Sequence, residues 1–560
     1  MNYIFKILLL YLILTGCTQH GKFEIIIRNG LIYDGSGSPS FMGDIAINDD
    51  TIAAIGNLKN AIGNLEIDAT GKAISPGFIN VQSWANESLI EDGCSQSDIR
   101  QGVTLEILGE GWSEGPYKEF MKKEKIEAQG DIKYPIEWNT LGQYLEFLEK
   151  KGVSTNVASF VGATTVRINV LKHEDRQPSV KELNEMKALV RQAMEEGAIG
   201  ISSALIYTPG SFADTDELIE LCKEVAKYDG IYISHVRSEG DQFLEALDEF
   251  IQITEKADIR SQIYHLKAAG TENWYKMDYA IEKIDSARAA GLGITANMYN
   301  YTAAGTSLYA TMPQWVQEGG HNAWVERLKD PEIRAKVVKE MNAPGIGWEN
   351  FLNMVGSSDN IIVVGLKNDS LKYLTGKTLT EIAELWEMPP AETIIDLVIR
   401  DNSPVHAVYF LMTEENIKKQ IALSWMNFGS DAESLAPEGN FLKANPHPRA
   451  YGNFSRLLGK YVREEKVISL EEAVCKLTSH PAKVMQIKQR GLLKEGYFAD
   501  VVVFDSGKIA DHSTFAEPHQ YSTGVEHVFV NGQQVLKDGE HTGALPGRFV
   551  KGPGWKGKPE

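Results

Sequence analysis

Two histidines and two carboxylates follow short apolar runs at four places in the sequence. His235 ends GIYISH and His265 ends SQIYH, while Glu110 ends VTLEILGE and Asp431 ends SWMNFGSD. Two neutral imidazoles and one carboxylate are the usual ligand set of a catalytic zinc, which keeps a fourth position open for water. A further carboxylate beside the metal can move the proton of that water. These four residues therefore predict a metal-dependent hydrolytic site.

The apolar runs that carry these residues alternate with stretches of helical period. TNVASFVG, AIGISSALIY and GLGITANMY have the form of short buried strands, whereas SVKELNEMKALVRQAMEEG and DQFLEALDEFIQITEKA have the period of a helix. Strands that alternate with helices indicate βα units, and their number suits a (β/α)₈ barrel. His235 and His265 are one such unit apart, so we expect both imidazoles at the mouth formed by the C-terminal ends of the strands.

Both ends of the chain have a different pattern, of short strands separated by tight turns. FEIIIRNGLIYDG and GDIAINDDTIAAIG lie near the start, and GYFADVVVFD and VEHVFVNGQQVLKDGEH near the end. Asn-Gly, Asp-Gly and Asp-Asp pairs mark the turns. Because strand edges left unpaired at either end would be a liability, we predict one small β-sandwich built from both termini.

The first sixteen residues are predicted to be a secretion leader. Lys6 precedes an apolar run from Ile7 to Leu14, which is far shorter than the roughly 20 residues that span a bilayer. The following LTGC resembles the bacterial lipoprotein signal, in which Cys17 becomes the lipidated first residue. We therefore expect an exported protein, lipid-anchored to a bacterial membrane and facing the periplasm. A plain signal peptide cut elsewhere is the alternative.

The charge argues against a nucleic-acid-binding protein, and the cysteine content argues against a fold held together by disulfides. The formal net charge of −20 would repel the phosphates of a nucleic acid. If Cys17 carries lipid, the three cysteines at 94, 222 and 475 cannot form a closed disulfide framework. With 560 residues and 43% hydrophobic content, the chain can bury more than one core.

The order of several segments resembles the N-acyl-D-amino-acid deacylase (D-aminoacylase) family of the amidohydrolase superfamily. The segments are RNGLIYDGSG, SPGFI, QGVTLEILGEG, YISHVRSE, IYHLKAAG, GSDAES, HPRAYGNFSRLLGKYV and LTSHPAKVMQIKQRGLLKEGYFADVVVFD. The resemblance implies a (β/α)₈ TIM-like barrel, a small β-sandwich formed by both termini and an insertion subdomain near the substrate. The expected limits are 22–75 and 487–550 for the sandwich, 76–304 and 416–486 for the barrel, and 305–415 for the insertion.

The same resemblance implies roles for the four residues already singled out. His235 and His265 correspond to the two histidines of the tightly held zinc. Glu110 stands where many members have a metal-binding cysteine, and a carboxylate there can still bind the metal. Asp431 corresponds to the acid/base aspartate.

Four further residues are implied to bind the substrate. Lys267 and Arg449 correspond to the pair that holds the α-carboxylate, and Tyr207 and Tyr299 to pocket tyrosines. Lys267 lies two residues after His265, so both side chains point to one face if the strand continues. The two cations favour an open-chain small-molecule substrate with a free carboxylate.

The sequence departs from the family at the second metal site. After PGFI the family pattern is Asp-x-His-x-His, and this chain has Asn80, Gln82 and Trp84; Ala163 stands where members often carry another histidine. Glutamine binds zinc poorly and tryptophan not at all. We therefore expect one zinc per chain and no second site, with Trp84 as a wall of the substrate pocket.

These observations predict a metal-dependent hydrolase that cleaves the amide bond of N-acyl-(D-)amino acids or dipeptide-like analogues. A metal-activated water would attack, with Asp431 as the general base. Two alternatives remain open at this point. The chain could be a catalytically inactive ligand-binding lipoprotein, or a hydrolase of a cyclic amide or lactone.

Overall fold

The computed structural model describes residues 21–557. Parallel strands in the middle of the chain close into a barrel. β8 (Asn156–Ser159) and β9 (Val161–Gly162) are separated by one residue and act as one strand. Val81 N donates to Phe428 O, and Ser83 bridges Ala432, which joins the first strand to the last. The prediction of a (β/α)₈ barrel is confirmed. In order around the barrel the strands are β6 (Phe78–Asn80), β7 (Val103–Leu108), β8 (Asn156–Ser159), β9 (Val161–Gly162), β10 (Gly200–Ala204), β11 (Ile231–His235), β12 (Arg260–Ile263), β13 (Ile294–Met298) and β17 (Met426–Phe428).

Amphipathic helices cover the outside of the barrel. α8 (Phe243–Ala257) buries Phe243, Leu247 and Phe250, which recur at helical spacing on one face. α6 (Val180–Glu195) begins at Ser179 with a capping box shared with Glu182. The other outer helices are α4 (Leu141–Lys151), α5 (Ala163–Leu171), α7 (Thr215–Ala226), α9 (Lys276–Ala289), α15 (Glu414–Ile421), α16 (Arg449–Arg456) and α17 (Leu470–Leu477).

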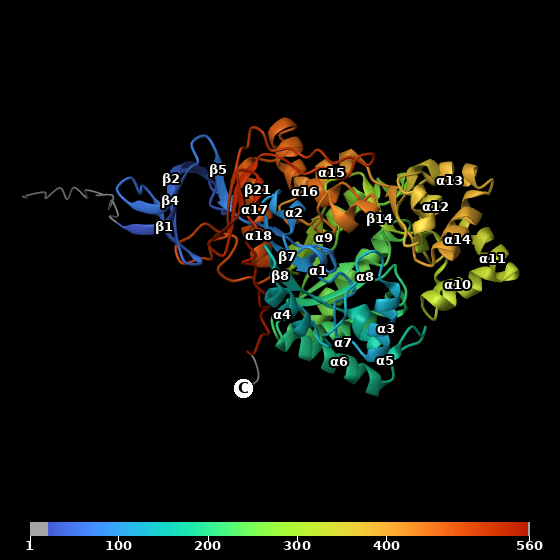
Figure 1. Ribbon diagram of the computed structural model, residues 1–560. Coiled ribbons are helices and arrows are strands. Elements are labelled where there is room, and N and C mark those ends of the chain that lie inside the picture. Colours follow the sequence, from blue (N-terminus) through green and yellow to red (C-terminus); the bar gives the residue numbers. More distant parts are fainter. Residues whose placement is uncertain (1–20, 558–560) are drawn as a thin grey trace, which may run out of the picture.

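Strands from both ends of the chain share one nine-stranded sheet beside the barrel (Figure 1). β5 (Ala73–Pro76) pairs in parallel with β1 (Lys22–Ile32) and antiparallel with β18 (Val501–Phe504), so the two termini meet there. Isoleucines and valines of both segments pack into a common core. The remaining strands are β2 (Phe41–Asn48), β3 (Thr51–Gly56), β4 (Ile62–Asp68), β19 (Val525–Val530), β20 (Gln533–Lys537) and β21 (Glu540–His541).

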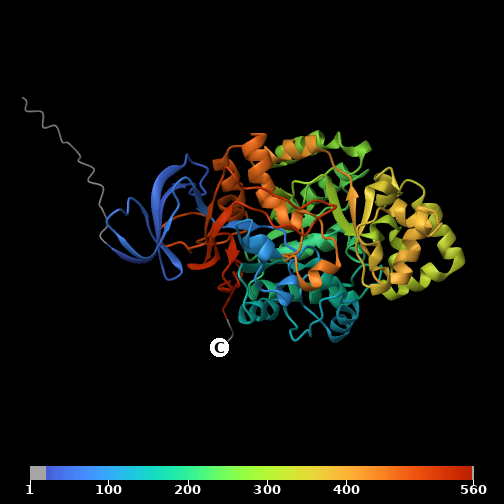
Figure 2. The ribbon, with the colours of Figure 1, turned by 45° about the horizontal axis from the view of Figure 1, so that its top comes forward.

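A helical subdomain on the opposite side of the barrel has its own hydrophobic core (Figures 1 and 2). It contains a three-stranded antiparallel sheet in the order β14 (Ala303–Ser307), β16 (His406–Phe410), β15 (Ile361–Gly365). The core residues run from Ala269 and Ala304 to Leu411. Its main elements are β14 (Ala303–Ser307), α10 (His321–Lys329), α11 (Pro331–Met341), α12 (Phe351–Met354), β15 (Ile361–Gly365), α13 (Leu379–Leu385), α14 (Pro390–Asp401) and β16 (His406–Phe410).

The predicted leader, with Cys17, lies outside the described residues. Within 21–557, no helix is both long enough and apolar enough to cross a membrane. Among the described residues, Cys94, Cys222 and Cys475 are free thiols.

Candidate metal and catalytic site

The four chemically distinctive residues come together at the C-terminal mouth of the barrel. His235 is the last residue of β11, whereas β7, β12 and β17 end two or three residues earlier than the sequence suggested, before Glu110, His265 and Asp431. His265 and Asp431 have positive φ values of 29° and 51°. Both residues therefore have a left-handed backbone conformation, which is uncommon for residues other than glycine and is found most often at active sites.

Glu110, His235 and His265 form a compact cluster of possible metal ligands. His235 Nδ1 lies 3.2 Å and His265 Nε2 lies 3.1 Å from the same oxygen, Glu110 Oε1. All three side chains are buried. Ligand atoms held by one tetrahedral zinc lie roughly 3.4 Å from each other, so this spacing and this donor set fit a divalent metal.

Charge inside the cluster is balanced by its own members. Burial alone would raise the pKa of Glu110, but the two imidazoles hold it well below its usual range. Burial lowers the pKa of His235, which favours the neutral ring that a metal requires. Burial and Lys267 would lower the pKa of His265, but the carboxylates of Glu110 and Glu239 raise it to about 9, so a metal that binds this ring must displace its proton.

Glu239 is a site residue that the sequence reasoning missed. Its Oε1 lies 3.0 Å from His265 Nδ1 and 2.7 Å from Lys267 Nζ. Burial would raise the pKa of Glu239, but Lys267 and the imidazoles lower it below its usual range. A carboxylate behind a ligand histidine orients the ring, which is the usual surrounding of a protein metal site. The available signal was an acid four residues after His235, in HVRSE.

Lys267 reaches the site by a route different from the expected one. β12 ends at Ile263, so neither His265 nor Lys267 continues the strand. Their side chains meet nevertheless, with Lys267 Nζ 2.7 Å from His265 Nδ1. Glu239 and the ring of Tyr299, at 5.7 Å, complete the surroundings of the ammonium group.

Asp431 is surrounded by hydrogen-bond donors. Its Oδ1 accepts hydrogen bonds from Gln82 Nε2 and from Trp84 Nε1, both at 3.0 Å. Its Oδ2 lies 2.8 Å from Arg449 Nη1. Burial raises the pKa of Asp431, and the guanidinium of Arg449 opposes this shift. Gln82 and Trp84, whose positions hold histidines in the family pattern, thus contact the carboxylate directly.

Arg449 is oriented by a histidine that the sequence reasoning set aside. His447 Nδ1 accepts a hydrogen bond from the Arg449 backbone N–H, and its Nε2 donates to Ala303 O at 2.9 Å. These contacts assign the neutral tautomer of His447, and burial holds its pKa well below the usual value. The guanidinium of Arg449 stacks 4.4 Å above the ring of Tyr299.

An aromatic row leads from the cluster into the helical subdomain. The ring of Tyr207 lies 5.1 Å from that of His235, 6.0 Å from that of Trp112 and 5.4 Å from that of Tyr309. Its hydroxyl accepts a hydrogen bond from Thr306 on β14. Tyr207 therefore lies where the barrel meets the subdomain.

A carboxylate of the helical subdomain, that of Glu349, contacts the loop that carries Glu239. Glu349 Oε1 accepts hydrogen bonds from Ser238 Oγ at 2.7 Å, from Glu239 N at 2.5 Å and from Gly240 N at 2.6 Å. Burial and the neighbouring Glu239 raise the pKa of Glu349 to about 7. This contact holds the Glu239 loop against the subdomain.

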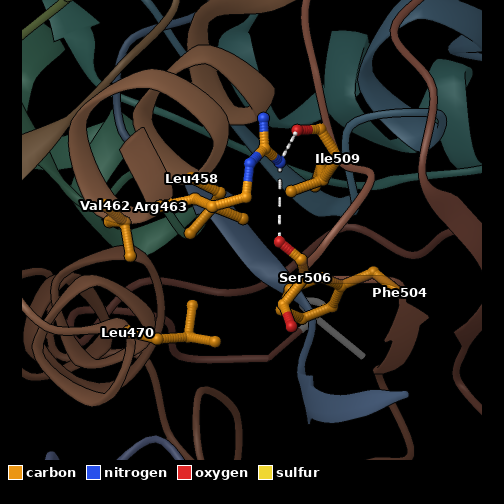
Figure 3. Close-up of a pocket in the computed structure, with 7 residues that line it drawn as sticks. All are labelled: Leu458, Val462, Arg463, Leu470, Phe504, Ser506 and Ile509. Atoms are coloured by element: carbon orange, nitrogen blue, oxygen red, sulfur yellow. Dashed lines mark hydrogen bonds between the residues drawn. The ribbon is translucent and has the colours of Figure 1, made fainter. Parts of the chain in front are cut away.

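A separate apolar cavity of about 180 Å³ lies away from this cluster (Figure 3). It is bounded by the π-helix η8 (Leu457–Glu464), by α17 and by the segment after β18. Arg463 closes one side by donating hydrogen bonds to the carbonyl oxygens of Ile509 and Ser506. None of its lining residues belongs to the candidate site.

Comparisons with known proteins align almost the whole chain with one group of enzymes. A model described as the amidohydrolase family matches residues 428–536. The chain is 30% identical to N-acyl-D-glutamate deacylase of Alcaligenes xylosoxydans xylosoxydans over 532 residues, which cover 95% of this chain and 97% of that enzyme.

Two solved structures have the same fold over nearly their full length. N-acyl-D-glutamate deacylase from Bordetella bronchiseptica, complexed with zinc and a phosphonate mimic of the reaction's tetrahedral intermediate, matches with a TM-score of 0.79 and 27% identity, covering 95% of this chain and 100% of that one. A D-aminoacylase, studied for one-metal activation and second-metal attenuation of its binuclear metal center, matches with a TM-score of 0.79 and 28% identity, covering 94% and 100%.

Proposed function

This chain belongs to the N-acyl-D-amino-acid deacylase family of amidohydrolases, and from that premise we propose that it hydrolyses the amide bond of an N-acyl-D-amino acid or a dipeptide-like analogue with a free α-carboxylate. It is an amidohydrolase that acts on C–N bonds other than peptide bonds.

The observation that carries the substrate proposal is a set of buried donors beside the ligand cluster. Among the residues that the structure describes, neither Arg449 Nε nor the Tyr299 hydroxyl has a hydrogen-bond partner. A buried donor without a partner is costly, so a ligand that accepts both bonds gains affinity. The planar guanidinium suits a carboxylate, and the nearby ammonium of Lys267 adds a second cation.

Glu110, His235 and His265 are proposed to hold one zinc. When bound, the metal supplies a Lewis acid that polarises the amide carbonyl and lowers the pKa of water. Asp431 accepts the proton of the attacking water as the new C–O bond forms, and returns it to the amine nitrogen as the C–N bond breaks. Lys267 and Arg449 hold the α-carboxylate, while Tyr207 and Trp84 are proposed to line the space for the rest of the substrate.

Arg449 is proposed to couple substrate binding to the release of the base. Its Nη1 lies 2.8 Å from Asp431 Oδ2. A substrate carboxylate that shares this guanidinium weakens its hold on Asp431, because one cation then serves two anions. The base becomes a better proton acceptor when the substrate is in place.

The test combines metal content with substrate preference. We expect the purified chain without its leader to contain about one zinc, to lose it in His235→Ala, and to hydrolyse N-acyl-D-amino acids faster than their L-isomers and their α-amides. A chain without metal, and with none taken up on reconstitution, would contradict the proposal and favour the ligand-binding lipoprotein. Turnover of cyclic amides or lactones alone would contradict the open-chain substrate.

The cellular location is proposed from the leader. We propose that Cys17 carries lipid and anchors the enzyme to a bacterial membrane, facing the periplasm. Growth with labelled palmitate should label the wild-type chain and leave Cys17→Ala unlabelled. Equal labelling of both chains would reject the anchor.

A further inference from the structure

The residues at the two histidine positions of the family pattern make specific contacts of their own. Gln82 Nε2 lies 2.5 Å from Glu110 Oε2 and 3.0 Å from Asp431 Oδ1, so one amide nitrogen bridges the two carboxylates. Trp84 Nε1 lies 3.0 Å from the same oxygen of Asp431. Gln82 is buried, and its Oε1 has no hydrogen-bond partner within residues 21–557.

The orientation of the Gln82 amide is determined by its neighbours. Its two N–H groups can serve one carboxylate each. With the amide turned over, Oε1 would face two carboxylate oxygens and no hydrogen would separate them. The repulsion between unshielded acceptors makes that arrangement unfavourable, so the N–H groups must point at Glu110 and Asp431.

The backbone holds both donors in register with Asp431. Asp431 N donates to Gln82 O at 2.9 Å, and Trp84 N donates to Ala432 O at 3.0 Å. Gly429 permits this close approach, because a Cβ there would lie 2.6 Å from Gln82 Cβ. The segment after β6 and the segment after β17 thus form a short ladder, and residues 82 and 84 share the face that meets Asp431.

These contacts put hydrogens where a second metal would need lone pairs. An indole N–H is a donor alone, and the amide nitrogen of glutamine likewise has no free lone pair to offer a metal. Two buried carboxylates, Glu110 and Asp431, repel each other unless a cation or donors lie between them. Here neutral N–H donors occupy that place.

From this geometry we propose that Gln82 and Trp84 are positioning residues that hold Asp431 in place of a second metal ion. The inference rests on the proposed function, in which Asp431 is the base. It assigns the two substituted positions a role in the reaction, as part of a site built for one metal. Because these donors exclude a second cation, excess zinc should not lower the activity of this enzyme by filling a second metal site.

The activity test compares two tryptophans whose indole N–H groups each donate a hydrogen bond to an aspartate. Trp425 Nε1 donates to Asp285 at 2.7 Å and lies just before β17, at the opposite end of the strand from Asp431. We expect Trp84→Phe to lower kcat by roughly 10- to 100-fold, with KM changed less than about threefold, because a shifted base costs turnover more than binding. Trp425→Phe, which loses an equivalent bond far from the base, should keep wild-type kcat. Unchanged kcat in Trp84→Phe would overturn the proposal.

A metal titration gives a readout that does not depend on turnover. With excess zinc, the wild-type chain should hold one equivalent by elemental analysis, and Gln82→His/Trp84→His should take up a second. Two equivalents in the wild type would overturn the proposal even if the enzyme is active. If the wild type hydrolyses no N-acyl amino acid, the proposed function fails, and this titration alone decides whether the donors exclude a second metal.

Discussion

The two halves of the barrel mouth are held together in opposite ways. In the metal-ligand half, possible ligand atoms of Glu110, His235 and His265 converge, and the ion pair of Glu239 and Lys267 lies behind His265. In the base half, Asp431 accepts hydrogen bonds from Gln82 and Trp84 and forms an ion pair with Arg449. Lone pairs bind cations, whereas N–H groups bind anions, so one side of the mouth suits a metal and the other suits a carboxylate without a metal.

The comparison also shows what a substitution can preserve. Gln82 and Trp84 stand where the family pattern has two histidines, and in place of two metal ligands they supply two donors to Asp431. The proposed role of Asp431 as base requires its carboxylate to be oriented and shielded from Glu110, and N–H groups can meet that need in place of a cation.

The largest expected effect separates the two halves by metal content. Asp431→Asn should lower kcat by roughly 1,000-fold, because a general base is lost, and leave the zinc content near that of the wild type. Glu110→Gln should lose both turnover and metal, because a ligand is lost. Measuring kcat together with elemental analysis checks both. Loss of metal in Asp431→Asn would show that Asp431 is itself a metal ligand, and the two halves would then not differ in this way.

The next effect concerns the buried ion pair of the metal-ligand half. Glu239→Gln leaves the Lys267 ammonium buried without its carboxylate, and should lower the free energy of unfolding by roughly 3 kcal/mol in metal-free protein. The double variant Glu239→Gln/Lys267→Met removes the stranded charge and should recover most of that loss. Urea denaturation measures both. Equal loss in the single and double variants would mean that packing, and not charge, holds this half.

A smaller effect, with a defined pH range, involves the contact between Glu349 and the Glu239 loop. The folded pKa of about 7 lies above the ordinary 4.5, so folding favours the protonated acid. The stabilisation is complete below pH 4.5, is lost as the pH rises through 7, and amounts to about 3 kcal/mol. Glu349→Gln should remove this pH dependence, while Glu384→Gln on the exposed face of α13 should retain it. Unfolding midpoints from pH 4 to 8 provide the measurement, and identical curves for the two variants would contradict it.

The smallest effect tests whether the helical subdomain supports the metal-ligand half through Tyr207. Tyr207→Phe loses the hydrogen bond from Thr306 and should cost about 1 kcal/mol, seen as a few-fold rise in KM with zinc content unchanged. Tyr279→Phe, which alters an exposed ring on α9, is the matched control. A fall in zinc content in Tyr207→Phe would show that the subdomain contact holds the ligands themselves.

Much of this architecture could be predicted from the sequence because it depends on local patterns. Alternation of apolar strands with amphipathic helices predicts βα units, and β11 and α8 follow that pattern closely. The rule that active residues follow barrel strands brought His235, His265, Glu110 and Asp431 to one mouth. Side-chain chemistry then restricts what two imidazoles and a carboxylate can bind.

The partners of these residues depended on tertiary structure. Glu349 is more than 100 residues from the loop that it contacts, and His447 acts through a backbone N–H and a carbonyl of β14. No periodicity records such contacts, because they arise from the way the subdomain packs on the barrel. The same holds for Lys267, whose path changes when β12 ends at Ile263.

The sequence by itself determined the fold class, the ligand types and the absence of histidine at positions 82 and 84. It could show that Gln82 and Trp84 are poor ligands, because that is a property of each side chain alone. Only the tertiary structure decided that their N–H groups meet Asp431. That outcome requires the segments after β6 and β17 to pair across almost 350 residues of intervening chain, and a contact set by such pairing follows from packing and not from local preference.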